Sequence, residues 1–409
     1  QKVYDTPDAE KIREAAFYRY EPGKLSRQAA DSLYAERNQG SVSRLELFAS
    51  CAYAQFLRYG LELMPRAEYT FEAVDFGSVY HGVLELFERG LKEDGISLRT
   101  LTEEEMEQRL WEAFSVLTKE YGETILYSSA RNERRIQQMH RLLLRSVRTM
   151  QYQMQKGSFE PTYFEQKFRM KGAFPLVGKI DRIDIRREDD TIYLKVMDYK
   201  SGMKQFSLDD VYYGLSMQLP VYMNAAVSFL QDRYPQTTII PAAMLYYRLQ
   251  KPIIEIEGTK AEEEIEAEIR KQMKPDGLLL GEDCVLTMLD QGFTTDSDVM
   301  RVGRKKDGSF KAASQVISQE DLGLLLSYTQ KKAEQMMQQM AEGEIAVTPL
   351  KTGNHTSCDY CAYREVCRMD ERIDGYRLQE LTPLTDEERK EAMERAVYGG
   401  SEEGHRDEK

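Results

Sequence analysis

The chain has 409 residues, of which 41% are hydrophobic, and its formal net charge is −13. This length is sufficient to bury a substantial core, either as one large domain with insertions or as two smaller domains. An acidic chain is poorly suited to broad nonspecific binding of nucleic acid, although local basic patches can persist within it. The sequence has neither an apolar run long enough to span a bilayer nor a secretory signal, so we expect a cytoplasmic protein without membrane association.

The N-terminal part is expected to be helical. Residues 1–40 are polar and helix-prone, and we assign them to an N-terminal helical extension. The chain starts at Gln1 rather than Met, which suggests a domain taken from something longer. Ser43 is the predicted cap of a helix that runs to about Tyr59 and whose second part opens at Cys51.

An amphipathic helix is predicted from Gly77 onward. Its apolar residues recur at helical spacing and are Tyr80, Val83, Leu84, Phe87 and Leu91. His81 lies beside this apolar stripe, where a hydrogen-bonded structural histidine is commoner than a metal ligand. Residues 95–156 are charge-rich and strongly helical, and we interpret them as a helical insertion rather than a site.

Residues 178–200 are predicted to form a β-hairpin whose two-residue turn is Asp189-Asp190. In this register Asp181 faces Asp198, and Lys200 lies on the same face. The rest of that face is largely apolar and contains Ile183, Ile185, Ile192, Leu194 and Val196. The opposite face is mixed and more polar, so we expect the apolar face to lie against the core.

The two facing aspartates predict a metal site. Carboxylates directly opposite each other have Cβ atoms about 5 Å apart and repel unless a cation or a shared proton intervenes. Hard oxygen ligands at this spacing suit Mg²⁺ or Mn²⁺. Lys200, two residues after Asp198, would then stabilise a hydroxide or the charge that develops on a phosphate. The alternative is a surface hairpin with unpaired acids.

The segments on either side of the hairpin predict a mixed β-sheet flanked by helices, an α/β fold. Residues 161–170 have the pattern of a strand that carries Glu165, followed by a turn at residues 172–175. Two further strands are predicted at residues 237–249 and 251–258.

One helix is predicted between these strands, with Ser207 as its cap. Gln218 and Tyr222 are four residues apart on this helix and therefore share one face, and Pro220 is expected to kink it. An amide and a phenol on a half-buried face is the alternative interpretation of this pair.

The C-terminal third contains a basic turn, a long helix and a charged tail. Residues 301–310 form a predicted turn whose cations are candidates for phosphate contact, namely Arg301, Arg304, Lys305 and Lys306. The alternative is a solvated loop. A long amphipathic helix is expected from Ser318 to Glu342, and residues 383–409 are expected to be disordered. The chain has no phosphate-binding loop of the G-x-x-x-x-G-K-[ST] kind, so ATP hydrolysis is not expected.

Cysteines give the second strong signal. Cys358, Cys361 and Cys367 form C-x₂-C-x₅-C, while Cys51 and Cys284 stand alone. Clustered cysteines in a cytoplasmic chain indicate metal or cluster ligation, and the spacing favours a [4Fe–4S] cluster over a Cys₄ zinc site. Cys51 is the expected fourth ligand and would staple the two ends of the domain together. The alternative is that Cys51 is a buried small hydrophobe, which is what we expect of Cys284.

Taken in order, these motifs resemble those of RecB-type nucleases in the PD-(D/E)XK superfamily. The resemblance rests on Gly77 to His81, the GKID of residues 178–181, the DYK of residues 198–200 and the Q-x-x-x-Y of residues 218–222. A lone upstream cysteine with a C-terminal trio resembles the iron–sulfur-stapled branch of that family. The flanking sequence, over roughly residues 40–375, most resembles the C-terminal nuclease domain of the B subunit of bacterial AddAB helicase–nucleases.

The resemblance implies a domain, a site and an activity. It implies a RecB-type nuclease domain over residues 41–382, in which residues 350–370 form the iron–sulfur segment. His81, Asp181, Asp198 and the backbone carbonyl of Tyr199 would bind Mg²⁺ or Mn²⁺, and Lys200 would activate the attacking water. Gln218 and Tyr222 would position DNA near the site.

The implied activity is a metal-dependent exonuclease that degrades single-stranded DNA delivered by an AddA-type helicase–nuclease partner, during the processing of double-strand breaks for recombinational repair. The strand ending 5′ at the break is the implied substrate. The inactivated helicase-like region that precedes this domain in the family's B subunit is not in this chain. Two alternatives remain open, a stand-alone Cas4-like iron–sulfur nuclease and a noncatalytic iron–sulfur DNA-binding module.

Overall fold

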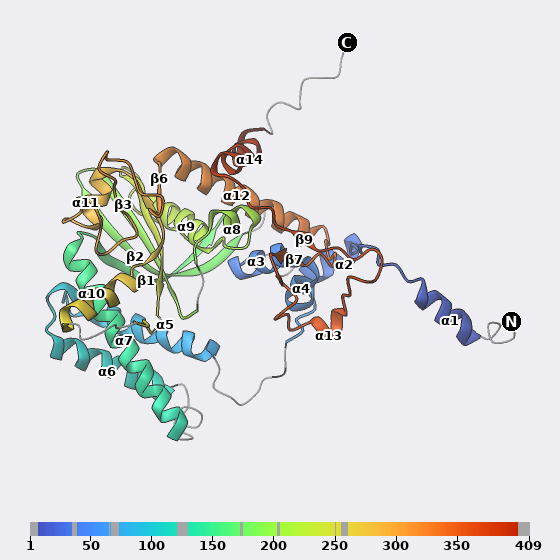
Figure 1. Ribbon diagram of the computed structural model, residues 1–409, viewed down its shortest axis with the longest axis horizontal. Helices are drawn as coiled ribbons and strands as arrows, with labels where there is room; N and C mark the ends of the chain where they lie inside the picture. Colours follow the sequence, from blue (N-terminus) through green and yellow to red (C-terminus); the bar gives the residue numbers. More distant parts are fainter. Residues whose placement is uncertain are drawn as a thin grey trace, which may run out of the picture.

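A computed structural model describes residues 7–34, 39–64, 66, 73–120, 130–171, 175–202, 205–249, 251–254 and 261–399 (Figure 1). The prediction of a turn at residues 172–175 falls largely outside these ranges, as do residues 400–409 of the predicted tail. No helix among the described residues combines the length and the apolar character needed to cross a membrane.

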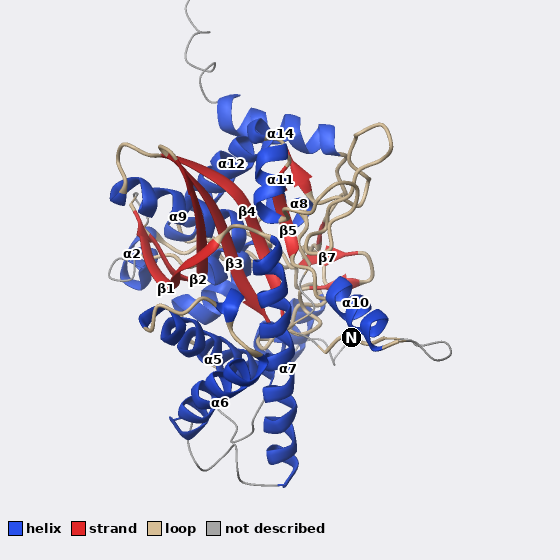
Figure 2. Cartoon of the chain, turned by 90° about the vertical axis from the view of Figure 1, so that its left-hand side faces the viewer, coloured by secondary structure: helices blue, strands red, loops and turns tan. Residues whose placement is uncertain are grey.

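The centre of the molecule is a six-stranded mixed sheet with the order β1-β2-β3-β4-β5-β6 (Figure 2). The strands are β1 (Glu160–Met170), β2 (Leu176–Glu188), β3 (Thr191–Lys200), β4 (Thr238–Arg248), β5 (Asp276–Leu280) and β6 (Val316–Ile317). β1, β2 and β3 pair antiparallel, β3 and β4 pair parallel through the helical crossover between them, β4 and β5 pair antiparallel, and β5 and β6 pair parallel. The predicted mixed α/β sheet is therefore confirmed.

The hairpin register is also confirmed. Ile183 pairs with Val196 and Ile185 with Leu194, and the turn is Asp189-Asp190. Asp189 has φ of 47°, in the left-handed region that Asp tolerates better than most residues. The ladder ends at the pair before the two aspartates, so Asp181 and Asp198 lie where the strands stop exchanging backbone hydrogen bonds.

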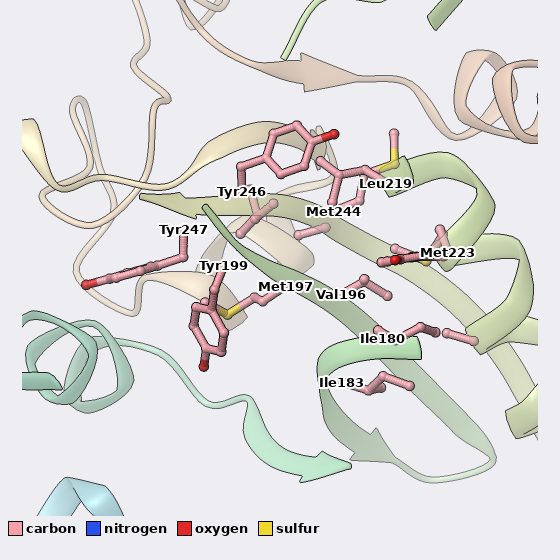
Figure 3. Packing of buried hydrophobic residues seen from close by; sticks show 14 of the residues in the cluster. Ile180, Ile183, Val196, Met197, Tyr199, Leu219, Met223, Met244, Tyr246 and Tyr247 are labelled. Atoms are coloured by element: carbon pink, nitrogen blue, oxygen red, sulfur yellow. The ribbon is translucent and has the colours of Figure 1, made fainter. Parts of the chain in front are cut away.

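Helices cover both faces of the sheet. Helix α9 (Gln218–Arg233) packs on β1, β3 and β4, and α12 (Gln319–Ala341) packs behind it. On the other face lie α5 (Ala73–Glu93), α6 (Glu103–Glu120) and α7 (Ala130–Lys156). Figure 3 shows Ile183 and Val196 on the side of α9, with Tyr199 and Tyr247 pointing away from it.

Because helices lie on both faces, the apolar face of the hairpin meets the core as predicted, and the more polar face is buried as well. Arg182, Asp184 and Tyr199 belong to the predicted polar face, yet each is at most 2% exposed. A sheet covered on both faces has no solvent side, so its polar residues must pair with one another.

The N-terminal half contains the expected helices with shifted boundaries. α1 (Pro7–Ala16) and α2 (Arg27–Tyr34) form the extension, and the helical insertion consists of a 3₁₀ turn η2 (Leu98–Thr100), α6 and α7. Helix α3 (Val42–Ser50) is capped by Ser41 rather than by the predicted Ser43, because the Ser41 hydroxyl accepts from the backbone N–H of Arg44. Cys51 separates α3 from α4 (Ala52–Gln55), which continues as a π-helical turn, η1 (Phe56–Gly60).

The predicted helix from Ser207 through Tyr222 is in fact two helices. α8 (Leu208–Tyr213) is capped by Ser207 as expected and ends at Gly214, whose φ is 84°. α9 then begins at Gln218, so Pro220 lies in its first turn, where no backbone N–H has an intrahelical partner. The predicted kink at Pro220 is therefore wrong.

The predicted strand at residues 251–258 is also wrong over its described part, since residues 251–254 have no regular structure. The next strand, β5, comes instead after the acidic helix α10 (Glu262–Gln272). All five residues of β5 are buried, but its sequence DGLLL is too short to show alternation.

The C-terminal part folds over the other end of the molecule. After α11 (Asp283–Leu289) and α12, a small sheet with the order β8-β7-β9 is built from β7 (Leu350–Thr352), β8 (His355–Thr356) and β9 (Gln379–Glu380). The short helix α13 (Arg364–Cys367) lies between β8 and β9.

The expected disorder after residue 383 is wrong for residues 386–398, which form helix α14 (Asp386–Tyr398). Thr385 and Glu388 form a capping box at its start. Helix α14 docks on the body through two ion pairs, Arg389 to Asp209 at 2.6 Å and Lys390 to Asp321 at 2.7 Å. The charge-rich composition of this segment is typical of a disordered tail, but here the charges form ion pairs with the rest of the protein.

Candidate metal centre and cysteine cluster

Three side chains from three different elements converge at the open end of the hairpin. His81 comes from α5, Glu165 from β1 and Asp181 from β2, and their potential ligand atoms all lie within 4.8 Å of one another. His81 Nδ1 lies 3.2 Å from Asp181 Oδ2. The arrangement brings His81, for which the sequence alone favoured a structural role, to the predicted carboxylate site.

Glu165 is a site residue to which the sequence analysis gave no role. The β1–β2 ladder pairs Phe164 with Arg182 and Gln166 with Ile180, which leaves Glu165 level with Asp181. Its φ of 50° is an outlier for a strand residue, so the backbone is distorted where this carboxylate enters the site. Extending the predicted hairpin register to the preceding strand would have placed Glu165 beside Asp181.

A second group of residues lies beside the first. Lys200 Nζ is 2.5 Å from Asp198 Oδ2 and donates to Gln218 Oε1 at 2.6 Å. Gln218 Nε2 donates to Asp198 Oδ1 at 2.6 Å and to the Tyr222 hydroxyl at 3.1 Å. All four predicted residues are therefore in contact, and the start of α9 is what places Gln218 over the end of β3.

The two groups are joined through Asp181. Its Oδ2, which contacts His81, also accepts a hydrogen bond of 2.8 Å from the backbone N–H of Tyr199, between Asp198 and Lys200. This bond replaces the backbone pairing that stops one residue earlier. The role of the Tyr199 carbonyl as a ligand stays a prediction.

The electrostatics of the site favour a bound cation. Burial, together with the negative charge of Asp181, raises the pKa of Asp198 to about 7. Burial also raises the pKa of Glu165. At His81, burial lowers the pKa, but the hydrogen bond and charge of Asp181 outweigh it, and the net shift is upward. Carboxylates and an imidazole gathered in this way form a donor set that fits a hard divalent cation.

Behind the site lies a buried charged network that the sequence analysis did not detect. Arg182 Nη1 donates to Glu88 at 2.6 Å, and Arg182 Nε donates to Asp184 at 2.6 Å. Lys195 lies 2.8 Å from Asp184, and the Tyr199 hydroxyl donates to Glu88 at 3.0 Å. Two acids and two bases balance one another, which allows the network to exist in the core. It ties α5, β2 and β3 together directly behind the candidate ligands.

The four predicted cluster ligands line one cleft of about 530 Å³. Cys51 lies at the break between α3 and α4, Cys358 and Cys361 follow β8, and Cys367 ends α13. Burial, with the charges of the other three cysteines, raises the pKa of Cys358 to about 11. Thiolates held this close together repel unless a metal offsets their charge, so the set fits a metal or an iron–sulfur cluster.

Hydrogen bonds hold the distant ends of the chain together around this cleft. The Ser357 hydroxyl donates to the carbonyl of Ser50 at 3.0 Å, next to Cys51. The Tyr363 hydroxyl donates to the carbonyl of Leu63 at 2.8 Å. Both bonds join residues about 300 positions apart, namely 307 and 300. These two segments are therefore joined by hydrogen bonds within the protein, in addition to any link through the cysteines.

Two other sequence predictions are corrected here. Cys284, expected to be buried, is exposed on α11. The basic segment 301–310 does turn, since Arg304 and Phe310 form an antiparallel bridge. However, Arg304 is paired with Asp283, and Arg301 Nε lies 3.9 Å from Asp276, so two of its four cations are engaged by acids rather than free for phosphate.

The sequence matches a known protein family over most of its length. Residues 39–368 match the family model of the PD-(D/E)XK nuclease superfamily. The chain is 36% identical over 390 residues to the B subunit of the ATP-dependent helicase/deoxyribonuclease of Lachnoclostridium phytofermentans, covering 93% of this chain and 34% of that protein.

Proteins of the same name in Clostridium kluyveri and Bacillus anthracis are also similar. The first is 33% identical over 370 residues, covering 87% of this chain and 32% of that protein. The second is 32% identical over 406 residues, covering 95% and 35%. The chain thus spans about a third of the length of these curated relatives.

Proposed function

Because this chain belongs to the PD-(D/E)XK nuclease superfamily, we propose that it hydrolyses phosphodiester bonds of DNA with the help of a divalent cation. One observation carries the proposal. His81, Glu165 and Asp181 converge within 4.8 Å at the end of the hairpin, next to the Asp198–Lys200 pair. Acidic residues on a solvated surface would not be expected to gather in this way around a histidine and a lysine.

His81, Asp181 and Asp198 would hold Mg²⁺ or Mn²⁺, with Glu165 and the carbonyl of Tyr199 as further candidate ligands. When bound, the cation would polarise the scissile phosphate and lower the pKa of a water molecule. The amide of Tyr199 keeps Asp181 oriented toward His81. Without a bound cation, the negative charge of these carboxylates would repel the DNA phosphate from the site.

Lys200 is the residue proposed to act on the water and on the phosphate. Its side chain is 21% exposed and its ammonium lies 2.5 Å from Asp198, so it can reach a nucleophile and a phosphate oxygen at this carboxylate. The ammonium would orient the attacking water and stabilise the charge that develops on the phosphate. Gln218 holds Lys200 and Asp198 together from α9, and with Tyr222 it would position the DNA strand.

For the cysteine cleft we propose a [4Fe–4S] cluster bound by Cys51, Cys358, Cys361 and Cys367. The cleft brings all four thiols together, and the C-x₂-C-x₅-C spacing differs from the repeated C-x₂-C of a zinc ribbon. The purified protein should be brown, and Cys361→Ser should lose iron and lower thermal stability. A colourless protein with stoichiometric zinc would replace the iron–sulfur assignment with a Cys₄ zinc site.

The relatives suggest a cellular context. They are named as subunits of an ATP-dependent helicase/deoxyribonuclease. We propose that this chain is the nuclease part of such a subunit, paired with an AddA-type helicase, and acts as an exonuclease on single-stranded ends in the cytoplasm during recombinational repair. Copurification with an AddA-type helicase would separate this role from that of a stand-alone nuclease.

Asp198→Ala provides the direct test of the nuclease. The variant should keep its fold and cluster, bind Mn²⁺ at least about tenfold more weakly in calorimetry, and lose Mg²⁺-dependent degradation of labelled single strands. Asp190→Ala, in the exposed turn of the same hairpin, is the matched control and should change neither property. Undiminished cleavage by Asp198→Ala would refute the assignment, and DNA binding without metal binding or cleavage would favour the noncatalytic module.

A further inference from the structure

Helix α7 carries a line of arginines along one side. Arg131, Arg134, Arg141, Arg145 and Arg148, here called the arginine stripe, follow one another at steps of three, seven, four and three residues. At 3.6 residues per turn these steps keep the side chains on one side of the helix. The whole helix holds seven basic residues and a single acidic one, Glu133.

The stripe faces solvent. The opposite side of α7 is buried and repeats with the same three- and four-residue steps, through Ile136, Met139, Leu143, Val147 and Met150. In the stripe, Arg145 is half-buried and the other four are exposed. Figures 1 and 2 show α7 running past the sheet beside α6, so the first half of the helix has its outer side uncovered by other described elements.

The stripe is also largely free of carboxylates. Arg148 is paired with Glu103, but Arg131, Arg134, Arg141 and Arg145 make no ion pair within the part of the chain that the structure describes. Several exposed helical cations elsewhere do pair with acids of their own helix, among them Arg13 with Glu10, Lys271 with Glu268 and Arg395 with Glu391. The chain has a net charge of −13, and a helix face that is merely solvated does not require such a row of unpaired positive charges.

The dimensions suit a polyanion. From Arg131 to Arg148 the stripe extends about 26 Å at 1.5 Å per residue. Neighbouring arginines three or four residues apart have Cβ atoms about 5–6 Å apart. Guanidinium groups bind phosphates through paired N–H donors and need no particular base sequence.

We propose that the arginine stripe binds the sugar–phosphate backbone of a DNA single strand and so holds the substrate outside the metal centre. The inference rests on the proposed nuclease function, which supplies the polyanion. The helical insertion, which we predicted to carry no site, would then bind DNA. The acidic remainder of the surface would repel DNA elsewhere and leave the stripe as a preferred track.

The test compares two triple variants with the same change of net charge. The first is Arg131→Gln/Arg134→Gln/Arg141→Gln in the stripe. The control is Arg13→Gln/Lys271→Gln/Arg395→Gln, which removes three exposed helical cations that already have acid partners. Glutamine keeps the helix propensity of arginine, and thermal unfolding of all three proteins checks the fold.

Binding of a fluorescent single strand is measured by anisotropy without divalent cations, over a range of salt concentrations. The stripe variant should bind at least about tenfold more weakly at low salt, and its salt slope should be smaller by about two, since each lost phosphate contact removes about 0.7 from the slope. The control should stay within about twofold. Cleavage of oligonucleotides too short to reach α7, and Mn²⁺ affinity, should be unchanged in the stripe variant.

Three results would overturn the proposal: no binding of the strand by the unsubstituted chain, unchanged affinity and slope in the stripe variant, or equal losses in the control. If the stripe variant binds DNA normally but no longer retains a helicase partner, the stripe is a protein interface instead. Failure of the nuclease proposal would look different, because the stripe would still bind DNA while Mn²⁺ binding and cleavage were missing.

Discussion

Tyr199 belongs to the buried charged network through its hydroxyl and contacts the candidate metal centre through its backbone N–H, which donates to Asp181. Removing the hydroxyl tests whether the network positions the ligands. The hydroxyl donates to the Glu88 carboxylate, 3.0 Å from each oxygen, and accepts from Arg182 Nη1 at 3.3 Å. Tyr199→Phe deletes these contacts and keeps the ring, which lies edge-on to His81 with 5.9 Å between ring centroids.

A matched control lies on the next strand. Tyr247 pairs with Tyr199 in the β3–β4 ladder, points to the same side of the sheet and is 0% exposed (Figure 3). Its hydroxyl donates at 3.0 Å to the carbonyl of Ser146, which has no contact with the metal centre. Tyr247→Phe therefore removes a buried phenol hydroxyl without touching the network.

The two variants should differ in both stability and metal binding. A hydrogen bond to a charged group contributes about 1.5–3 kcal/mol, so Tyr199→Phe should lower the free energy of unfolding by about 2 kcal/mol. Tyr247→Phe loses a neutral hydrogen bond and should cost about 1 kcal/mol. Since Glu88 lies on the helix of His81 and the amide of Tyr199 holds Asp181, Tyr199→Phe should also weaken Mn²⁺ binding about tenfold.

Urea unfolding and calorimetric titration with Mn²⁺ measure the two effects separately. Tyr247→Phe should leave Mn²⁺ affinity within about twofold of the unsubstituted chain, because its hydroxyl does not reach the ligand-bearing elements. If Tyr199→Phe loses stability but binds Mn²⁺ as tightly as the control does, the network stabilises the core without positioning the ligands, and our reasoning is refuted.

Three further substitutions test other parts of the structure. Arg182→Met leaves two buried carboxylates, Glu88 and Asp184, with Lys195 as the remaining base of the network. The free energy of unfolding in urea should fall by about 3–5 kcal/mol, and a fall below about 1 kcal/mol would contradict the buried network. Gln218→Ala should slow cleavage of single strands at least about tenfold, because Gln218 holds both Lys200 and Asp198, and an unchanged rate would remove Gln218 from the site. Asp189→Val should lower stability by about 1–2 kcal/mol and Asp189→Gly should not, because φ is 47° there; equal thermal stability of the two variants would argue against this turn.

Short-range patterns determined the parts of the fold that depend on neighbouring residues. The hairpin register follows from a two-residue turn and strict alternation, so the positions of Asp181, Asp198 and Lys200 could be predicted from 23 consecutive residues, 178–200. The apolar stripe of α5 and the caps Ser207 and Ser318 are equally local.

Local patterns failed where burial or docking by distant segments decides the outcome. The second face of the hairpin looks polar, yet α5 and α7 cover it and its charges neutralise one another. The charged C-terminal segment looks disordered, yet α14 uses its charges in ion pairs with α8 and α12. Composition alone cannot distinguish a charge that faces water from one that faces a partner.

The sequence by itself determined which residue types carry the chemistry and, through the hairpin, how two aspartates and a lysine share one strand end. It also placed three cysteines together, because they lie within ten residues, 358–367. Only the tertiary structure decided that His81 reaches Asp181, that Glu165 enters the same site, and that Cys51 joins the other three. These contacts join segments from 16 to more than 300 residues apart, and sequence periodicity holds no information about which distant faces meet.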